Sequence, residues 1–243
     1  MNTKDIIRTL DVAVLKSTDT LNFALATAQA GKKLGFASIC VRPDYVFEVS
    51  QLLGTKCACK VGTVIGFPLG YGPTISKMQE VEQALLNGAT EFDMVMNLGY
   101  FQSKDYGKVE ADIARIVSLT NPHTLKVILE TCLWSKEEIV LACQLVESAG
   151  GDYVKTSTGF AAKGATREAV QAMMDTVGHR IGVKASGGID CREAAESYLK
   201  MGCRRLGVGA QKYAEVLKEI EFVNLENYRR PPNFVGPLDI YFN

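Results

Sequence analysis

Two lysines mark the points where short apolar runs give way to polar loops. Lys155 follows Asp-Tyr-Val and precedes Thr-Ser-Thr-Gly, and Lys184 follows Ile-Gly-Val and precedes Ala-Ser-Gly-Gly. A lysine amine attacks a carbonyl only when it is neutral, and burial and a nearby cation both disfavour its charged form. Two lysines that end neighbouring buried strands therefore predict a nucleophilic amine and a second cation that keeps it neutral.

Asp93 is the third candidate for chemistry. It interrupts the apolar run Phe-Asp-Met-Val-Met, so we expect its side chain to be buried. A buried carboxylate needs a cationic partner. Taken singly, Asp93 and Lys155 each fit an ion pair that only holds the fold together. Placed between the two lysines, Asp93 would instead shuttle protons, and we predict Lys155, Lys184 and Asp93 as the catalytic group.

The loops after the two lysines predict a polar ligand. Thr158 and Gly159 belong to a stretch of hydroxyls and backbone N–H groups that suits a sugar-like or phosphorylated molecule. Gly187 and Gly188 let a backbone approach a ligand closely, and they precede a helix expected from Asp190, which is an anion-binding arrangement. A plain turn between a strand and a helix is the alternative explanation for the glycine pair.

The chain is poor in histidine, which disfavours several kinds of site. Only His123 and His179 are present, and both fall in predicted surface loops. Ser-His-Asp hydrolysis, histidine general catalysis and histidine-rich metal sites are disfavoured together. Cys57 and Cys59 are too close in sequence for a usual pair of zinc ligands, so we expect no metal site.

Charge and cysteine usage point to a cytoplasmic protein with a small-molecule partner. The 243 residues include 27 Lys and Arg against 27 Asp and Glu, and this balance argues against nucleic-acid or membrane-surface binding. No stretch approaches 18 consecutive apolar residues, and the N-terminus lacks the apolar core of a signal peptide. Seven scattered cysteines are typical of reduced thiols.

Short apolar runs alternate with amphipathic segments along the chain. The predicted strands cover residues 10–15, 36–41, 60–65, 91–96, 125–130, 152–155, 180–184 and 204–208. The predicted helices cover residues 18–34, 75–86, 105–119, 135–149, 166–177 and 190–201, and Ser135 with Glu138 forms a capping box.

Eight strands that alternate with helices predict an α/β protein, a single (β/α)8 TIM barrel with a short N-terminal helix. We assign the barrel to residues 1–220 and a C-terminal tail to residues 221–243, which packs on the barrel or on a partner subunit. A doubly wound open sheet is the alternative, but no Gly-x-Gly-x-x-Gly follows the first strand. In a barrel, Asp11, Cys40, Asp93, Lys155, Lys184, Gly207 and Glu130 would all lie at or near the strand ends that form one mouth.

Several motifs resemble the deoxyribose-phosphate aldolase family, a family of class I aldolases. Val-Lys-Thr-Ser-Thr-Gly-Phe at residues 154–160 and Val-Lys-Ala-Ser-Gly-Gly-Ile at 183–189 are similar to its two signature lysine motifs. Residues 64–70, 91–97 and 125–133 add further matches in the same order, so that the resemblance runs from about Leu10 to Gly209. It implies a (β/α)8 barrel, no metal or organic cofactor, and reversible cleavage of 2-deoxyribose 5-phosphate to glyceraldehyde 3-phosphate and acetaldehyde.

The resemblance also implies roles for individual residues. Lys155 would form the Schiff base, Lys184 would lower the pKa of Lys155 and join a proton relay, and Asp93 would act as acid and base with a bound water. A free lysine has a pKa of ~10.4, and lowering it to ~7 increases the neutral fraction at pH 7 about a thousandfold. The residues expected around the substrate and its phosphate are Asp11, Cys40, Thr158, Gly159, Gly187, Gly188 and Gly207.

Three positions depart from the family pattern on the substrate side. Ala13, Gly209 and Ala210 stand where the family has residues with polar or hydroxyl side chains. The substrate alternatives are therefore a different, possibly unphosphorylated, deoxy or keto sugar or short aldehyde, and a barrel that binds a sugar phosphate without turnover. We expect a homo-oligomer, a dimer or a tetramer. The family often ends in a segment with a functional tyrosine, and Tyr241 is not assigned that role.

Overall fold

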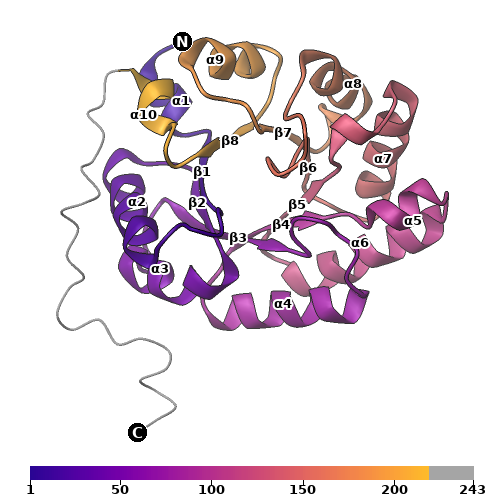
Figure 1. Ribbon diagram of the computed structural model, residues 1–243, viewed down its shortest axis with the longest axis horizontal. Coiled ribbons are helices and arrows are strands. Elements are labelled where there is room, and N and C mark those ends of the chain that lie inside the picture. The colour runs from indigo at the N-terminus through magenta and orange to yellow at the C-terminus, as the bar shows by residue number, and fades with distance from the viewer. Residues whose placement is uncertain (219–243) are drawn as a thin grey trace, which may run out of the picture.

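Eight parallel strands close into a barrel in the computed structural model, which describes residues 1–218 (Figure 1). The strands are β1 (Leu10–Val14), β2 (Ser38–Val41), β3 (Lys60–Ile65), β4 (Glu91–Val95), β5 (Thr124–Ile128), β6 (Tyr153–Lys155), β7 (Gly182–Ser186) and β8 (Arg205–Gly209). Each strand pairs with the next along the chain, and β8 pairs with β1. The predicted (β/α)8 barrel is confirmed, and the alternative of an open sheet is wrong.

The register of the barrel brings the charged residues of the sequence analysis into rows. Lys155 on β6 lies directly opposite Lys184 on β7, and Asp93 on β4 lies opposite Lys126 on β5. Side chains alternate between the two faces of a strand, so Glu91 and Asp93 share one face. All five side chains are buried, and the barrel interior therefore holds charges as well as apolar groups.

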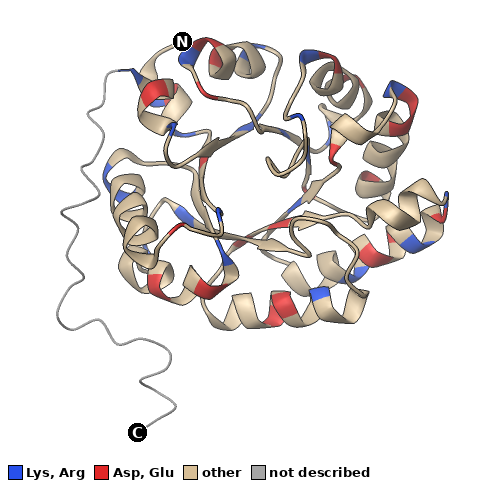
Figure 2. Ribbon diagram, viewed as in Figure 1, with Lys and Arg blue, Asp and Glu red and all other residues tan. Residues whose placement is uncertain are grey.

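Helices surround the barrel on its outer side (Figure 1). They are α1 (Thr3–Ile7), α2 (Leu21–Leu34), α3 (Val46–Leu53), α4 (Thr74–Leu86), α5 (Leu98–Gln102), α6 (Tyr106–Thr120), α7 (Lys136–Ser148), α8 (Arg167–Val177), α9 (Arg192–Lys200) and α10 (Tyr213–Leu217), with 3-10 turns at Pro43–Tyr45 and Thr131–Leu133. Their apolar faces pack against the strands in one continuous core. Figure 2 shows charged residues both on these outer helices and on the strands of the barrel.

Several element boundaries differ from the sequence predictions for identifiable reasons. The strand expected from residue 180 begins at Gly182, because Arg180 N and Ile181 N still bond to Val177 O at the end of α8. The last expected helix begins after Cys191, not Asp190. The capping box of Ser135 and Glu138 is confirmed at the start of α7. The helices α3, α5 and α10 were not predicted.

The described residues stop short of the predicted tail. The tail assigned to residues 221–243, including Tyr241, lies outside the part of the chain that the structure describes. Within residues 1–218, no helix has both the length and the apolar character needed to cross a membrane.

Candidate active site

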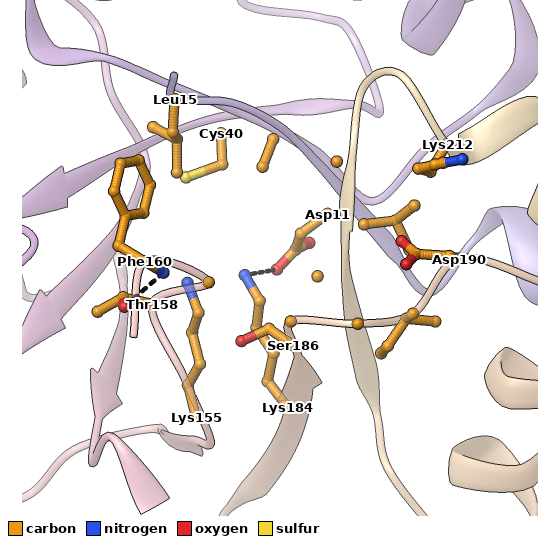
Figure 3. Close-up of a pocket in the computed structure, with 18 of the residues that line it drawn as sticks. Asp11, Leu15, Cys40, Lys155, Thr158, Phe160, Lys184, Ser186, Asp190 and Lys212 are labelled. Carbon is orange, nitrogen blue, oxygen red and sulfur yellow. Dashed lines mark hydrogen bonds and ion pairs between the residues drawn. The ribbon is translucent and has the colours of Figure 1, made fainter. Parts of the chain in front are cut away.

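A cavity of about 490 Å³ opens at the mouth of the barrel, where the carboxyl ends of the strands meet (Figure 3). Both predicted catalytic lysines line it. The seven residues expected around the substrate also line it, namely Asp11, Cys40, Thr158, Gly159, Gly187, Gly188 and Gly207. Asp93 is not part of the lining. The structure therefore brings the predicted site residues together in and directly beneath one cavity.

Asp93 lies between the two lysines, as predicted. Its Oδ2 atom accepts hydrogen bonds from Lys155 Nζ and Lys184 Nζ, each at 2.7 Å. The three residues are between 1 and 4% exposed. They come from three different strands, so the closed barrel is what places both amines on one carboxylate oxygen. A proton can pass between the two lysines across that single atom.

Asp11 extends this cluster on the other side of Lys184. Asp11 Oδ2 lies 2.7 Å from Lys184 Nζ, and Figure 3 shows the two side chains meeting inside the cavity. Asp11 Oδ1 accepts a hydrogen bond from Ser38 Oγ at 2.8 Å and another from the Arg205 guanidinium. Within residues 1–218, Lys184 is therefore held by two carboxylates, whereas Asp93 is the one carboxylate paired with Lys155.

The sequence predictions missed three charged residues that complete the cluster. Lys126 Nζ lies 2.6 Å from Glu91 Oε2 and 3.1 Å from Asp93 Oδ1. Arg205 donates to Glu91 Oε1 at 2.7 Å. A signal was present, because Lys126 interrupts an apolar run just as Asp93 does, and Glu91 precedes Asp93 by the two residues that place both on one face of a strand.

The charges of this buried cluster do not balance. It contains four cations, Lys126, Lys155, Lys184 and Arg205, and three carboxylates, Asp11, Glu91 and Asp93. Uncompensated charge is costly in a buried site, so one of the cations is favoured to lose its proton. Lys155 is the cation with the fewest carboxylate contacts, and it shares its only partner oxygen with Lys184.

The directions of the pKa shifts single out the same lysine. Burial lowers the pKa of Lys155, Asp93 opposes that effect, and the charge of Lys184 adds to the lowering. Burial would also lower the pKa of Lys184 and Lys126, but the adjacent carboxylates outweigh it and raise both. Burial would raise the pKa of Asp93, yet the three lysines hold it well below its usual range. Of the three lysines around Asp93, Lys155 is therefore the one whose surroundings favour loss of its proton, beside an Asp93 held in its ionised form.

Two predicted substrate residues have hydrogen bonds or packing that limit their roles. The Thr158 hydroxyl donates to Glu130 Oε2 at 2.5 Å. Gly207 lies so close to Lys184 that an added Cβ would stand 3.2 Å from Lys184 Cε and 2.6 Å from Ser186 Cβ. Gly207 therefore makes room for Lys184 as well as for a ligand. Cys40 lines the cavity as a neutral thiol, because burial raises its pKa to about 12.

The end of the cavity away from Lys155 has a different character, and we call it the far end. It is formed by residues 187–190, 207–209, 211 and 212, with Lys16 from the loop after β1. Gly187 and Gly188 have φ values of 85° and 74°, which favour glycine. Lys212 Nζ is bonded to Glu215 at 2.8 and 3.0 Å, and this bond and the charge of Glu215 raise the pKa of Lys212. Asp190, which also lines the cavity, adds to that effect.

The three departures from the family pattern are not equivalent in space. Ala13 and Gly209 line the cavity. Ala210 is fully buried and is not part of the lining. Only the first two positions therefore bear directly on a ligand.

Comparisons with known proteins agree with this geometry. The sequence pattern described as DeoC/LacD family aldolase matches residues 7–208. A protein named deoxyribose-phosphate aldolase from Listeria monocytogenes is 44% identical over 207 residues, which cover 84% of this chain and 92% of that protein. A protein of the same name from Aciduliprofundum boonei is 39% identical over 92% of this chain and its own whole length.

Solved structures give the same answer at the level of the fold. A putative deoxyribose-phosphate aldolase from Coccidioides immitis superposes with a TM-score of 0.84 at 37% identity, covering 90% of this chain and 87% of its own. A deoxyribose phosphate aldolase from Aeropyrum pernix, described as having a unique tetrameric structure, superposes with a TM-score of 0.82 at 31% identity, covering 89% of this chain and 91% of its own.

Proposed function

The chain belongs to the DeoC/LacD aldolase family and is an aldolase, a lyase, and we propose that it cleaves 2-deoxy-D-ribose 5-phosphate to D-glyceraldehyde 3-phosphate and acetaldehyde through a Schiff base on Lys155. The observation that carries this proposal is the surplus of one cation in the buried cluster around Asp93. A neutral lysine at the base of an open cavity is the group that imine chemistry requires.

The reaction begins with attack of the neutral Lys155 amine on C1 of the open-chain sugar and loss of water. The resulting protonated imine withdraws the electron pair as the C2–C3 bond breaks. The C3 hydroxyl loses its proton, and C3 becomes the aldehyde carbon of glyceraldehyde 3-phosphate. The C1–C2 enamine then takes a proton at C2, and water hydrolyses the imine to release acetaldehyde and restore Lys155.

Lys184 and Asp93 supply charge and protons to these steps. Lys184 remains an ammonium, because Asp11 and Asp93 both hold it. Lys155 Nζ lies 2.7 Å from the same Asp93 oxygen, so the charge of Lys184 disfavours a second proton-bearing amine there and favours the neutral form of Lys155. Once Lys155 is an imine, Lys184 is the acid nearest to it across Asp93. Asp93 stays ionised and relays the proton, with a water completing the path to substrate.

The phosphate of this substrate would lie at the far end. The Gly187–Gly188 turn before α9 and the exposed Lys16 ammonium support an anion there. No metal or organic cofactor takes part in this scheme.

One experiment tests the mechanism directly. The protein is incubated with acetaldehyde and reduced with borohydride, and the adduct is located by intact mass and peptide mapping. We expect a single ethyl group of about 28 Da on Lys155, because reduction of an acetaldehyde imine leaves N-ethyl lysine. The absence of an adduct, or an adduct on another lysine, would contradict the mechanism.

A second candidate substrate is an unphosphorylated deoxy sugar or short aldehyde. The observation that favours it is Asp190, whose carboxylate lines the far end, together with the absence of hydroxyls at Ala13 and Gly209. Comparing kcat/KM for deoxyribose and its 5-phosphate separates the two. A strong preference for the phosphate supports the first candidate, and equal values or a preference for the free sugar support the second.

The proposal extends to assembly and setting. A homo-oligomer is supported by the tetrameric relative from Aeropyrum pernix, and light scattering of the purified chain tests it. We also propose that the reaction serves deoxyribonucleotide catabolism in the cytoplasm.

A further inference from the structure

Glu130 is a buried carboxylate that the proposed reaction does not use. It lies two residues after the end of β5, and it is only 3% exposed. Its backbone has φ 55° and ψ 57°, the left-handed region that residues with a Cβ rarely adopt. A strained residue that is also buried and ionisable needs a physical reason, and its contacts supply one.

The Glu130 carboxylate holds the loop that follows β6, 28 residues along the chain. Both of its oxygens lie near Thr158 N, at 3.3 and 3.4 Å, and Oε2 also accepts from the Thr158 hydroxyl at 2.5 Å. The same hydroxyl accepts a hydrogen bond from Phe160 N at 3.0 Å. Glu130 thus fixes residues 158–160, which we call the lip, through one threonine.

This link is made by hydrogen bonds and not by an ion pair. Burial raises the pKa of Glu130, the hydrogen bonds from Thr158 oppose that effect, and Lys155 is the charged group that acts on it electrostatically. A carboxylate oxygen can accept the N–H and the O–H of Thr158 together, so both donors of this residue are satisfied inside the fold.

The lip forms the wall of the catalytic cavity beside Lys155. Thr158, Gly159 and Phe160 all line that cavity, and Figure 3 shows Phe160 standing next to the Thr158 hydroxyl. The Phe160 ring packs edge-on against Phe67, with ring centres 5.1 Å apart. A neighbouring cavity of about 420 Å³ lies on the other side, and it shares only Leu15 and Phe160 with the first.

We propose that Glu130 is a positioning residue for the Lys155 chemistry, because its carboxylate holds the lip so that Phe160 separates the catalytic cavity from its neighbour. Without that hold, the two cavities merge and the substrate carbonyl loses its fixed approach to the amine. The inference rests on the proposed function, since it concerns the site where that reaction takes place.

The test compares four variants by separate kcat and KM values and by the rate of borohydride trapping with acetaldehyde. Glu130→Leu removes the whole link, and Thr158→Val removes its shortest bond, from the Thr158 hydroxyl, while the longer backbone N–H bonds remain. We expect kcat/KM to fall about ten- to a hundredfold, with the larger loss in Glu130→Leu, since small displacements of a substrate have effects of that size. Glu130→Gln keeps a carbonyl oxygen that accepts both donors, and we expect a loss within about threefold. The double variant Glu130→Leu/Thr158→Val should be no worse than Glu130→Leu alone.

Glu138→Leu is the matched control. Glu138 lies in the first turn of α7, and its carboxylate also accepts a hydrogen bond from a backbone N–H, that of Ser135 at 2.8 Å, but it does not line the cavity. We expect this variant to lose thermal stability and to keep its kcat and KM. If Glu130→Leu fails to fold, the kcat and KM of Thr158→Val test the inference, because this variant only exchanges a hydroxyl for a methyl.

Three results would overturn the inference: unchanged kinetics in Glu130→Leu and Thr158→Val, an equal kinetic loss in Glu138→Leu, or a Glu130→Gln variant as impaired as Glu130→Leu. The wild type is measured first. A wild type without a Lys155 adduct contradicts the proposed function, whereas a normal wild type with normal lip variants contradicts only the role of Glu130.

Discussion

The two ends of the cavity at the barrel mouth are built on different principles. At the lysine end, charged side chains from six strands of the barrel contact one another at 2.6 to 3.1 Å, and the proposed catalytic residues Lys155, Lys184 and Asp93 are at most 4% exposed. At the far end, glycine backbone dominates and the charged side chains, Asp190, Lys212 and Lys16, reach solvent. The buried end fixes the kind of chemistry, because moving any of its charges disturbs the others. The exposed end can change sequence at low cost, and under the proposed function we expect substrate choice to reside there.

The largest expected effect comes from removing the amine at the buried end. Lys155→Met should abolish the borohydride-trapped adduct and reduce kcat/KM by about 10⁴-fold or more, as loss of an enzymatic nucleophile does. The variant should fold normally, because three cations and three carboxylates then remain in balance. Borohydride trapping and kinetics test the loss of activity, and thermal unfolding tests whether the variant keeps its stability. A large loss of stability would show that Lys155 is needed as a charged partner of Asp93.

Lys184→Met should have the next largest effect, through the pKa of Lys155. With Lys184 gone, charges balance only if Lys155 keeps its proton, so the pKa of Lys155 rises. Less neutral amine is then available at pH 7, and the acidic limb of the pH–rate profile moves to higher pH. We expect kcat/KM at pH 7 to fall about a hundredfold, which is the lower end of the range for removing a group that transfers protons in catalysis. A profile that keeps its position would contradict the role of Lys184 as the cation that keeps Lys155 neutral.

Lys126→Met sharpens the same point with a residue that does not line the cavity. It removes a cation from Asp93 Oδ1, so the full charge of Asp93 acts on Lys155 and Lys184, and the acidic limb again moves to higher pH. We expect about a tenfold loss at pH 7, near 1.4 kcal/mol of transition-state stabilisation. Lys77→Met is the control, because Lys77 is equally buried and lies 2.6 Å from Asp112 outside the cavity. It should lose stability without moving the profile.

The buried end was also the easier end to predict from sequence. A carboxylate inside an apolar run has few explanations other than a buried ion pair, so the sequence alone predicts the burial and pairing of Asp93. Lys126 was missed, because a lysine that alternates with apolar residues also fits a strand with one side in solvent. Lys60 shows the difficulty, since it opens β3 in a similar context and is exposed. The sequence does not distinguish the buried Lys126 from the exposed Lys60, because the burial of Lys126 follows from closure of the barrel around its side chain.

Long-range and conformational features had no sequence signal of their own. The link from Glu130 to Thr158 depends on a left-handed backbone at a residue that is not glycine, and it joins positions 28 residues apart. The helix Val46–Leu53 was missed because it is only eight residues long and follows directly on the turn that starts at Pro43. The family pattern correctly placed Ala13 and Gly209 on the cavity, but it could not show that Ala210 faces away from it.

The smallest expected effect lies at the far end, and it tests whether charge there sets the substrate. Asp190→Asn removes one exposed negative charge from the lining. We expect kcat/KM for 2-deoxyribose 5-phosphate to rise about two- to fivefold, which corresponds to the ~0.4–1 kcal/mol typical of exposed charges. The value for unphosphorylated deoxyribose should not change, and the gain should shrink as salt is added. Asp175→Asn on the outer helix α8 is the control, since Asp175 is also exposed but does not line the cavity. A parallel change for both sugars would mean that Asp190 acts on the shape of the far end and not on its charge. The view that the buried end fixes the chemistry would then stand, but the view that the exposed end selects the substrate by charge would be wrong.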